Sequence, residues 1–256
     1  MMKIATIQTE LVWEDAVANR ANFDVHLKEC SAADIILLPE MFTTGFSMQP
    51  AGLAEGMEGP SMDWMRRRAA HYQAVIAGSL IIRDDGKFYN RLIWMRPDGT
   101  FEQYDKRHLF TLAGEHHAYE PGSAQVVVEY KGWRICPLIC YDLRFPVWSR
   151  NVFDYDLLIY LANWPRSRAH HWKSLLTARA IENQSYVIGV NRVGKDENAL
   201  HYGGDTTVVD YAGNLQYRMN DRSHVAIHHL DREQLRTYRA RFSFLPDRDT
   251  FTLDHT

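Results

Sequence analysis

Short apolar segments alternate along the chain with stretches whose apolar residues recur at helical spacing. The short segments are rich in β-branched and aromatic residues and stop at turn-forming residues, which predicts buried strands. The predicted strands are Lys3–Gln8, Asp34–Pro39, Ala74–Arg83, Lys87–Met95, Phe101–Asp105, Gln125–Tyr130, Arg134–Ile139, Leu157–Leu161, Tyr186–Asn191, Thr206–Asp210, Leu215–Met219 and His224–His229.

Four stretches have the pattern of helices that cover a sheet. They are Trp13–Cys30, Met62–Tyr72, His170–Gln184 and Asp231–Arg239. Ser61 is the expected N-cap of the second helix. Other strands are separated only by short turns such as Pro97–Thr100 and therefore form hairpins. Because hairpins and helix-separated strands occur together, the pattern predicts an α/β fold with mixed sheets and not an all-parallel sheet.

The composition is that of an ordinary globular protein. The chain has 256 residues, of which 46% are hydrophobic and 24% charged, so it can bury a large core. No repeat, low-complexity tract or linker rich in Gly and Pro interrupts it, and we expect a single domain spanning residues 1–256. The formal net charge of −3 provides no basic surface, so we expect neither nucleic acid nor a membrane as partner.

Membrane insertion and secretion are not predicted. Met1–Gln8 reads as the start of a first strand and not as a signal peptide. The longest apolar run, Leu157–Ala162, is far shorter than the roughly 20 residues that span a bilayer. Three cysteines are too few, and odd in number, for a disulfide framework, so we expect reduced thiols and a cytoplasmic location.

Three predicted strands end at residues of complementary chemistry. Cys140 directly follows an apolar strand, and Glu40 and Lys106 stand at the ends of two others. A cysteine attacks as the thiolate, and its free pKa of about 8.5 leaves little thiolate at neutral pH. Glu40 would take the thiol proton and return it to a leaving amine. Lys106 and the backbone N–H of Tyr141 would stabilise an oxyanion. Such a site would transfer the acyl group of an amide or a nitrile.

Residue types alone leave other interpretations open. A cysteine in an apolar run is usually inert core, which is the expectation for Cys30 and Cys136. Three pairs of adjacent histidines invite zinc, but neighbouring side chains on a strand or helix point apart, and no H-E-x-x-H or C-x-x-C motif accompanies them. We expect neither a metal nor an organic cofactor. His108 is expected to be a structural hydrogen-bond partner and not a base.

Three motifs, in this order, resemble those of the nitrilase (carbon–nitrogen hydrolase) superfamily. They are Leu38-Pro39-Glu40, Tyr104-Asp105-Lys106-Arg107-His108-Leu109-Phe110 and Cys140-Tyr141-Asp142-Leu143-Arg144-Phe145-Pro146. The resemblance assigns Glu40 as general base, Lys106 as oxyanion stabiliser and Cys140 as nucleophile. It also implies a second catalytic glutamate, which orients the lysine and the substrate amide. Glu115 matches that glutamate better than Glu120 does.

The resemblance covers nearly the whole chain and, within the superfamily, is closest to bacterial ω-amidases. Further matching segments are Leu38–Phe46, Leu161–Pro165, Ala178–Gln184, Gly189–Gly194 and Tyr202–Thr206. It implies a four-layer α-β-β-α sandwich of two mixed sheets flanked by helices, assembled as a homodimer or larger homo-oligomer. It also implies hydrolysis of small ω-amides of dicarboxylic acids, such as 2-oxoglutaramate and 2-oxosuccinamate. A cysteine thioester would form, and the products would be the 2-oxo acid and ammonia.

Such a substrate carries a carboxylate at the end away from its amide, so the pocket should offer a cation. Arg144, Arg166 and Arg168 are candidates for this cation. The alternative role of Arg144 is a salt bridge that holds the turn after Cys140. Trp172 is a candidate for an apolar wall of the substrate pocket. The predicted substrate-binding residues are Tyr141, Phe42, Arg144, Trp164 and Arg168.

Rival functions remain open on the sequence alone. The same chemistry would serve a nitrile, an N-carbamoyl amino acid or an aliphatic amide. A thioester could also pass its acyl group to an acceptor other than water. A different class of function is ligand binding on the same fold without catalysis, against which the intact Glu40, Lys106 and Cys140 argue.

Overall fold

The computed structural model describes residues 1–253, and the last three positions of the predicted domain, 254–256, lie outside the described residues. Its strands are β1 (Met2–Gln8), β2 (Ile35–Leu37), β3 (Val75–Asp84), β4 (Lys87–Met95), β5 (Phe101–Asp105), β6 (Val128–Tyr130), β7 (Trp133–Ile139), β8 (Leu157–Leu161), β9 (Tyr186–Val190), β10 (Val193–Lys195), β11 (His201–Val209), β12 (Leu215–Asn220) and β13 (His224–Leu230). Its α-helices are α1 (Ala16–His26), α2 (Pro50–Leu53), α3 (Pro60–Tyr72), α4 (Glu115–Ala118), α5 (Pro146–Ser149), α6 (Ala169–Asn183) and α7 (Arg232–Arg241). No helix within residues 1–253 combines the length and the apolar character that a membrane crossing requires.

The strands form two mixed sheets. The first has the order β13-β1-β2-β3-β4-β5, in which β1, β2 and β3 run parallel and their neighbours antiparallel. The second has the order β10-β11-β9-β8-β7-β6, in which β7, β8 and β9 run parallel, and β12 pairs with β11. Because parallel strands end at a common edge, the residues that follow them gather there. The predicted mixture of hairpins and helix-separated strands is confirmed.

Alternating side chains divide each strand of the first sheet between two cores. Ile4 of β1 and Ile35 of β2 belong to the apolar cluster that is shared with the second sheet. Ile7 and Ile36, which point the opposite way, pack with the residues of α1 and α3. The sheets are therefore buried on both faces, and their strands read as nearly continuous apolar runs.

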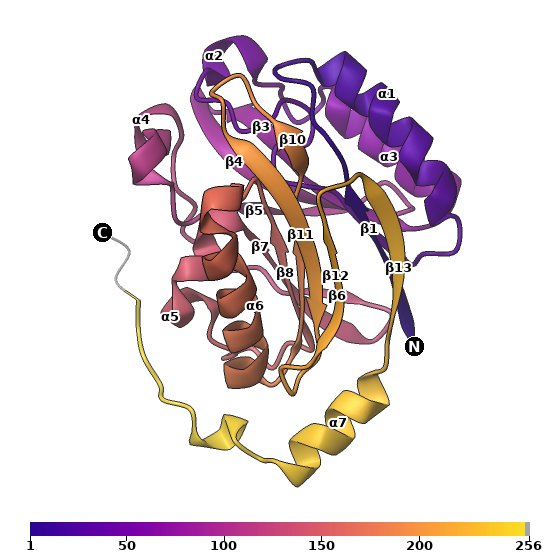
Figure 1. The fold of residues 1–256 in the computed structure, drawn as a ribbon, viewed down its shortest axis with the longest axis vertical. Helices are drawn as coiled ribbons and strands as arrows, with labels where there is room; N and C mark the ends of the chain where they lie inside the picture. The colour runs from indigo at the N-terminus through magenta and orange to yellow at the C-terminus, as the bar shows by residue number, and fades with distance from the viewer. Residues whose placement is uncertain (254–256) are drawn as a thin grey trace.

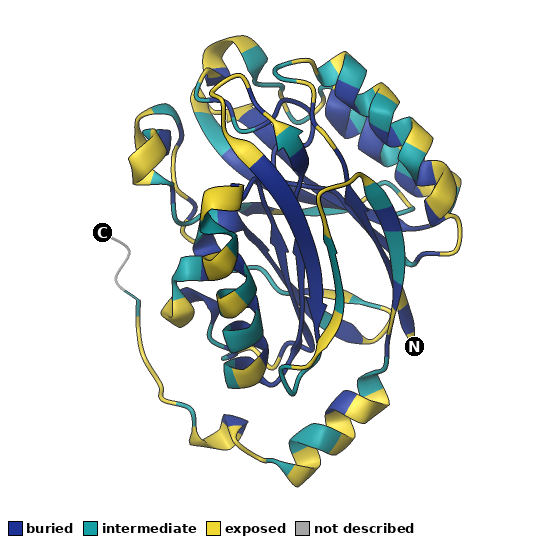
Figure 2. Ribbon diagram, in the orientation of Figure 1, coloured by how far each residue is buried: buried dark blue, intermediate teal, exposed yellow. Residues whose placement is uncertain are grey.

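Helices form the two outer layers. Figure 1 shows α1 and α3 side by side over one sheet, and α5 and α6 over the other. The central strands β8 and β9 are fully buried, whereas β12 is partly exposed (Figure 2). Trp172 and Leu176 of α6 pack directly against Gly189 of β9, where a Cβ atom would approach Trp172 to 2.5 Å. The four-layer α-β-β-α sandwich that the resemblance implied is confirmed. The assignment of residues 1–256 to a single domain stays a prediction.

The sequence pattern missed several local features. Strand β10 and the first residues of β11 escaped because Gly194, Gly203 and Gly204 dilute the β-branched signal. The cap of α3 was also assigned wrongly: its N-cap is Gly59, and Pro60 occupies the first turn. Ser61 instead donates its N–H and its hydroxyl to the carboxylate of Glu55, at 2.6 Å and 2.7 Å. The capping oxygens thus come from Glu55, a residue upstream of the helix that the usual N-cap pattern does not indicate.

A close approach between β3 and the segment after β2 provides a test of this packing. A Cβ atom at Gly78 would lie 2.7 Å from the ring of Phe42, whereas one at Gly52 would meet nothing within 4 Å. We expect Gly78→Ala to lower the free energy of unfolding by about 1–3 kcal/mol through overpacking. Gly52→Ala is the control and should change it little. Urea unfolding of both variants checks this, and equal stability of the two would contradict the packing described.

Candidate active site

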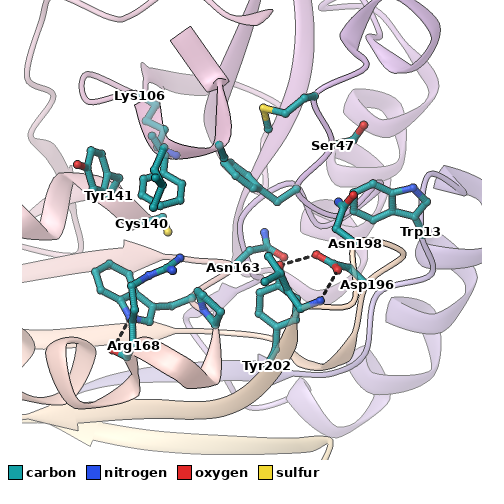
Figure 3. A pocket seen from close by; sticks show the side chains of 18 of the residues that line it. Trp13, Ser47, Lys106, Cys140, Tyr141, Asn163, Arg168, Asp196, Asn198 and Tyr202 are labelled. Atoms are coloured by element: carbon teal, nitrogen blue, oxygen red, sulfur yellow. Dashed lines mark hydrogen bonds between the residues drawn. The ribbon is translucent and has the colours of Figure 1, made fainter. Parts of the chain in front are cut away.

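The ends of several strands bring the three predicted catalytic residues to one place. Glu40 follows β2, Lys106 directly follows β5, and Cys140 directly follows β7. Lys106 and Cys140 line a cavity of about 450 Å³. Figure 3 shows both residues at one part of this cavity, close to Asn163, which follows β8. The parallel strands β7 and β8 therefore deliver Cys140 and Asn163 to the same sheet edge.

Lys106 is paired with two carboxylates in a fully buried cluster. Its Nζ donates to Oε1 of Glu40 at 2.8 Å and to both carboxylate oxygens of Glu115 at 2.9 Å. Asn90 of β4 donates its amide to Oε1 of Glu40 at 2.8 Å and to Oε1 of Glu115 at 3.3 Å. An ammonium group has three donors. All three hydrogen bonds that Nζ makes are to these two carboxylates, two of them to Glu115.

The same cluster holds Glu40 in a fixed orientation. The backbone N–H of Asn163 donates to Oε2 of Glu40 at 2.9 Å, and the Asn163 amide donates to the Glu40 carbonyl at 2.6 Å. Glu40 and Glu115 are both fully buried and are not part of the cavity lining, whereas Lys106 and Cys140 are.

Burial and the surrounding charges set the protonation of the site. Burial by itself would lower the pKa of Lys106, but the charges of Glu115 and Glu40 outweigh it and raise that pKa. Burial raises the pKa of the Cys140 thiol well above its ordinary value, and the charge and hydrogen bond of Glu40 raise it further, against the opposing charge of Lys106. The pKa of Glu115 is also raised, by burial in the first place.

These shifts favour a protonated thiol at rest. Two carboxylates face one ammonium group, so the cluster offers Cys140 no surplus positive charge. A protonated thiol has to lose its proton before or during a nucleophilic attack, which requires a base.

The backbone of Cys140 is strained. Its φ is +40°, in the left-handed region that non-glycine residues rarely occupy, and it opens the short 3₁₀ turn Cys140–Arg144. Asp142, within this turn, accepts a hydrogen bond from the backbone N–H of Ile139 at 3.1 Å. The sharp turn directs the sulfur into the cavity and leaves the N–H groups of the first turn without helical partners. The predicted oxyanion donor, the N–H of Tyr141, belongs to this turn.

Most of the predicted substrate-binding residues line the cavity. Tyr141, Arg144, Trp164 and Arg168 all contribute to its wall. Phe42 does not: its side chain is fully buried and packs against Phe23 and Trp64 on the side of α1 and α3. The placement of Phe42 in the substrate site was therefore wrong.

The family of the chain follows from comparison with known proteins. The family described as carbon–nitrogen hydrolase matches residues 3–240. The chain belongs to the carbon–nitrogen hydrolase family. It is 48% identical over 253 residues to an omega-amidase of Yersinia enterocolitica, and the match covers 98% of each chain. It is also 35% identical over 193 residues to a 2-oxoglutaramate amidase of Bacillus subtilis, over 73% of this chain and 74% of that protein.

A solved structure agrees with this relationship. A carbon–nitrogen hydrolase superfamily protein of Xanthomonas campestris, which carries an arsenic adduct in its active site, superposes with a TM-score of 0.97. The two chains are 43% identical, and the match covers 99% of each. This carbon–nitrogen hydrolase is accordingly an enzyme, and its relatives support amidohydrolase activity.

Other candidates of the sequence fall into place beside the site. Trp172 is fully buried and donates its ring N–H to the Asp205 carbonyl at 2.8 Å, so it is core and not wall. Cys136 is buried in β7, as expected. Arg144 forms no ion pair with a carboxylate within residues 1–253, and its guanidinium instead lies over the Trp164 ring at 4.8 Å.

Two residues of the cluster were not predicted. Asn163 follows β8 by two residues, so the strand-end signal that indicated Cys140 could have indicated it too. Asn90 lies inside β4 with no local signal, because its role depends on contacts with Glu40 and Glu115, which are distant in sequence. Beyond Cys140 the cavity extends to a wall that includes Trp13, Ser47 and Asn198 (Figure 3).

Replacing Glu40 tests two proposed effects on Cys140, namely proton transfer during turnover and the elevated pKa of the thiol. We expect Glu40→Gln to reduce turnover by about 100-fold or more, since a positioned acid–base group contributes roughly 10²–10⁴-fold. The pKa of Cys140 should fall, because Glu40 no longer raises it while the charge of Lys106 remains. Ultraviolet thiolate absorbance against pH measures this, with Cys140→Ala in each background as the blank. A thiol that titrates at the same or a higher pH in Glu40→Gln would contradict the assignment.

Proposed function

We propose that the enzyme hydrolyses the terminal amide of small dicarboxylate ω-amides, such as 2-oxoglutaramate and 2-oxosuccinamate, to the 2-oxo acid and ammonia. The observation that carries the substrate class is a pair of arginines on the wall that holds Cys140. Arg144 and Arg168 both line the cavity, and within residues 1–253 neither forms an ion pair with a carboxylate. An anionic end group on the substrate would supply the missing partner.

Aromatic faces hold the two guanidinium groups in place. Arg144 lies over Trp164 at 4.8 Å, and Arg168 lies over Phe110 at 5.1 Å. Burial lowers the pKa of Arg168, and the charge of Arg144 lowers it further. A carboxylate would relieve this concentration of positive charge. Because an arginine pairs with a carboxylate through two parallel hydrogen bonds, it also fixes the direction of the substrate relative to Cys140.

The proposed reaction begins with attack of Cys140 on the amide carbon. Glu40 takes the thiol proton as the carbon–sulfur bond forms. The ammonium group of Lys106 and the N–H of Tyr141 stabilise the developing oxyanion. Glu40 then returns the proton to the nitrogen as the carbon–nitrogen bond breaks, and ammonia leaves. Water, deprotonated by Glu40, attacks the thioester carbon. The carbon–sulfur bond then breaks, the acid leaves, and Glu40 returns the proton to the sulfur of Cys140. Glu115 keeps Lys106 charged and oriented throughout.

Names of relatives support the same substrate class without proving it for this chain. The omega-amidase and the 2-oxoglutaramate amidase are similar proteins with their own substrates. The alternatives are a nitrile, an N-carbamoyl amino acid or an aliphatic amide as substrate, and a binding protein without catalysis. The unpaired arginines favour an anionic substrate over a neutral one. The absence of a metal or cofactor requirement, assembly into a homodimer or larger oligomer, and a cytoplasmic location stay predictions.

Ammonia release from a substrate panel tests the proposal. The panel contains both ω-amides, a neutral aliphatic amide of the same length, the matching nitrile and an N-carbamoyl amino acid. We expect the highest kcat/KM for the ω-amides. Turnover of the nitrile with none of the ω-amides would overturn the proposed substrate class. No ammonia from any of the compounds would favour the non-catalytic alternative.

The arginine subsite has its own variant. We expect Arg168→Gln to lower kcat/KM for an ω-amide by about 10- to 150-fold, because a charge-assisted hydrogen bond contributes roughly 1.5–3 kcal/mol. The neutral amide of the panel should be nearly unaffected. Arg166→Gln is the matched control, since Arg166 pairs with Asp221 and does not line the cavity. An equal loss on the neutral amide would show that Arg168 does not bind the carboxylate.

A further inference from the structure

Asp142 is a fully buried carboxylate that lies beside the active site but does not line its cavity. Its Oδ2 accepts from the N–H of Ile139 at 3.1 Å and from the hydroxyl of Tyr104 at 2.8 Å. Its Oδ1 accepts from the backbone N–H of His108 at 3.0 Å and contacts Nδ1 of the same residue at 2.8 Å. One side chain therefore joins the end of β7 to the segment that follows β5.

His108 is held in place from its other faces. Its ring stacks on Phe145 with a centroid separation of 3.7 Å and an interplanar angle of 5°, and it meets the edge of Trp148 at 5.9 Å. The ring does not line the cavity, so it cannot touch a bound substrate. Its one polar contact at Nδ1 is the carboxylate of Asp142, which assigns the proton to that nitrogen.

The two partners have equivalent positions relative to the reacting residues. His108 lies two residues after Lys106, and Asp142 lies two residues after Cys140. A bond between them ties the chain just after Lys106 to the chain just after Cys140. We propose that the His108–Asp142 pair is a positioning device that fixes the distance and direction between Lys106 and Cys140.

The strained backbone of Cys140 explains why its position has to be held by its surroundings. A residue held at φ +40° persists only where its surroundings impose that conformation. The bonds from Asp142 to Ile139 and to His108 bracket Cys140 and tie its turn to the lysine segment. Loosening them lets the sulfur move relative to the oxyanion donors. Because neither partner contacts substrate, the loss should fall on kcat and not on KM.

Two substitutions at one position test the proposal. His108→Phe keeps the stacking on Phe145 and removes the Nδ1 donor, whereas His108→Asn places an amide N–H close to the position of Nδ1. We expect His108→Phe to reduce kcat by about 10- to 100-fold, as a misplacement of roughly 1 Å in a reacting group does. Its KM should stay within about twofold of the wild-type value. His108→Asn should retain most of the activity.

A second readout keeps this test separate from the choice of substrate, since the inference rests on the proposed roles of Lys106 and Cys140. Chloroacetamide alkylation of Cys140, followed by peptide mass spectrometry, reports the placement of the thiol even if no ω-amide is turned over. The buried Cys30 and Cys136 serve as internal references. Alkylation should slow in His108→Phe by a factor similar to the loss of kcat, and recover in His108→Asn.

Controls separate positioning from stability. Thr6→Val removes the buried contact between Thr6 and His228 at 2.9 Å, and neither residue lines the cavity. This variant should lower the melting temperature without changing kcat. Tyr104→Phe removes another hydrogen bond to Asp142. If His108→Phe does not fold, this variant tests the proposal in its place, and it should lower kcat with KM unchanged.

The proposal is overturned if His108→Phe keeps wild-type kcat and alkylation rate. Equal losses in His108→Asn and His108→Phe, or a similar kcat loss in an equally destabilised Thr6→Val, would also overturn it.

Discussion

The ammonium group of Lys106 lies between the carboxylates of Glu40 and Glu115, and all three side chains are fully buried. Charges removed from water in this way are stable only while each keeps its partner. The three residues come from the segments after β2 and β5 and from the start of α4, so their pairing holds three parts of the chain together. The cavity, the thiol and the proposed chemistry all depend on this arrangement.

The same charges explain how a buried cysteine can be both stable and reactive. Burial and the charge of Glu40 raise the pKa of the Cys140 thiol, which favours its protonated form. The proposed reaction then requires a substrate whose oxygen is stabilised by the charge of Lys106. Positive charge without a carboxylate partner lies instead on the cavity wall, at Arg144 and Arg168. The separation of these two electrostatic regions is what favours an amide at one end of the substrate and a carboxylate at the other.

Much of this was visible in the sequence, for an identifiable physical reason. Buried strands produce apolar runs, and the polar residue that ends such a run lies at a sheet edge, which is how Cys140 and Lys106 were found. Phe42 was misplaced because it is close to Glu40 in sequence. The intervening Met41 has φ +44°, and the chain turns so that the Phe42 ring faces the opposite core. Asn90 and the bonds of Asp142 could not be predicted, since they depend on contacts between distant segments.

The most direct measurement is a double-mutant cycle on the free energy of unfolding, with Lys106→Met, Glu115→Gln and the double variant. Lys106→Met leaves two buried carboxylates unpaired and should cost about 3–5 kcal/mol. The double variant removes one of those charges and should be more stable than the sum of the single effects, by at least about 1 kcal/mol. Single effects that add to within about 0.5 kcal/mol would show that the buried cluster does not hold the site together.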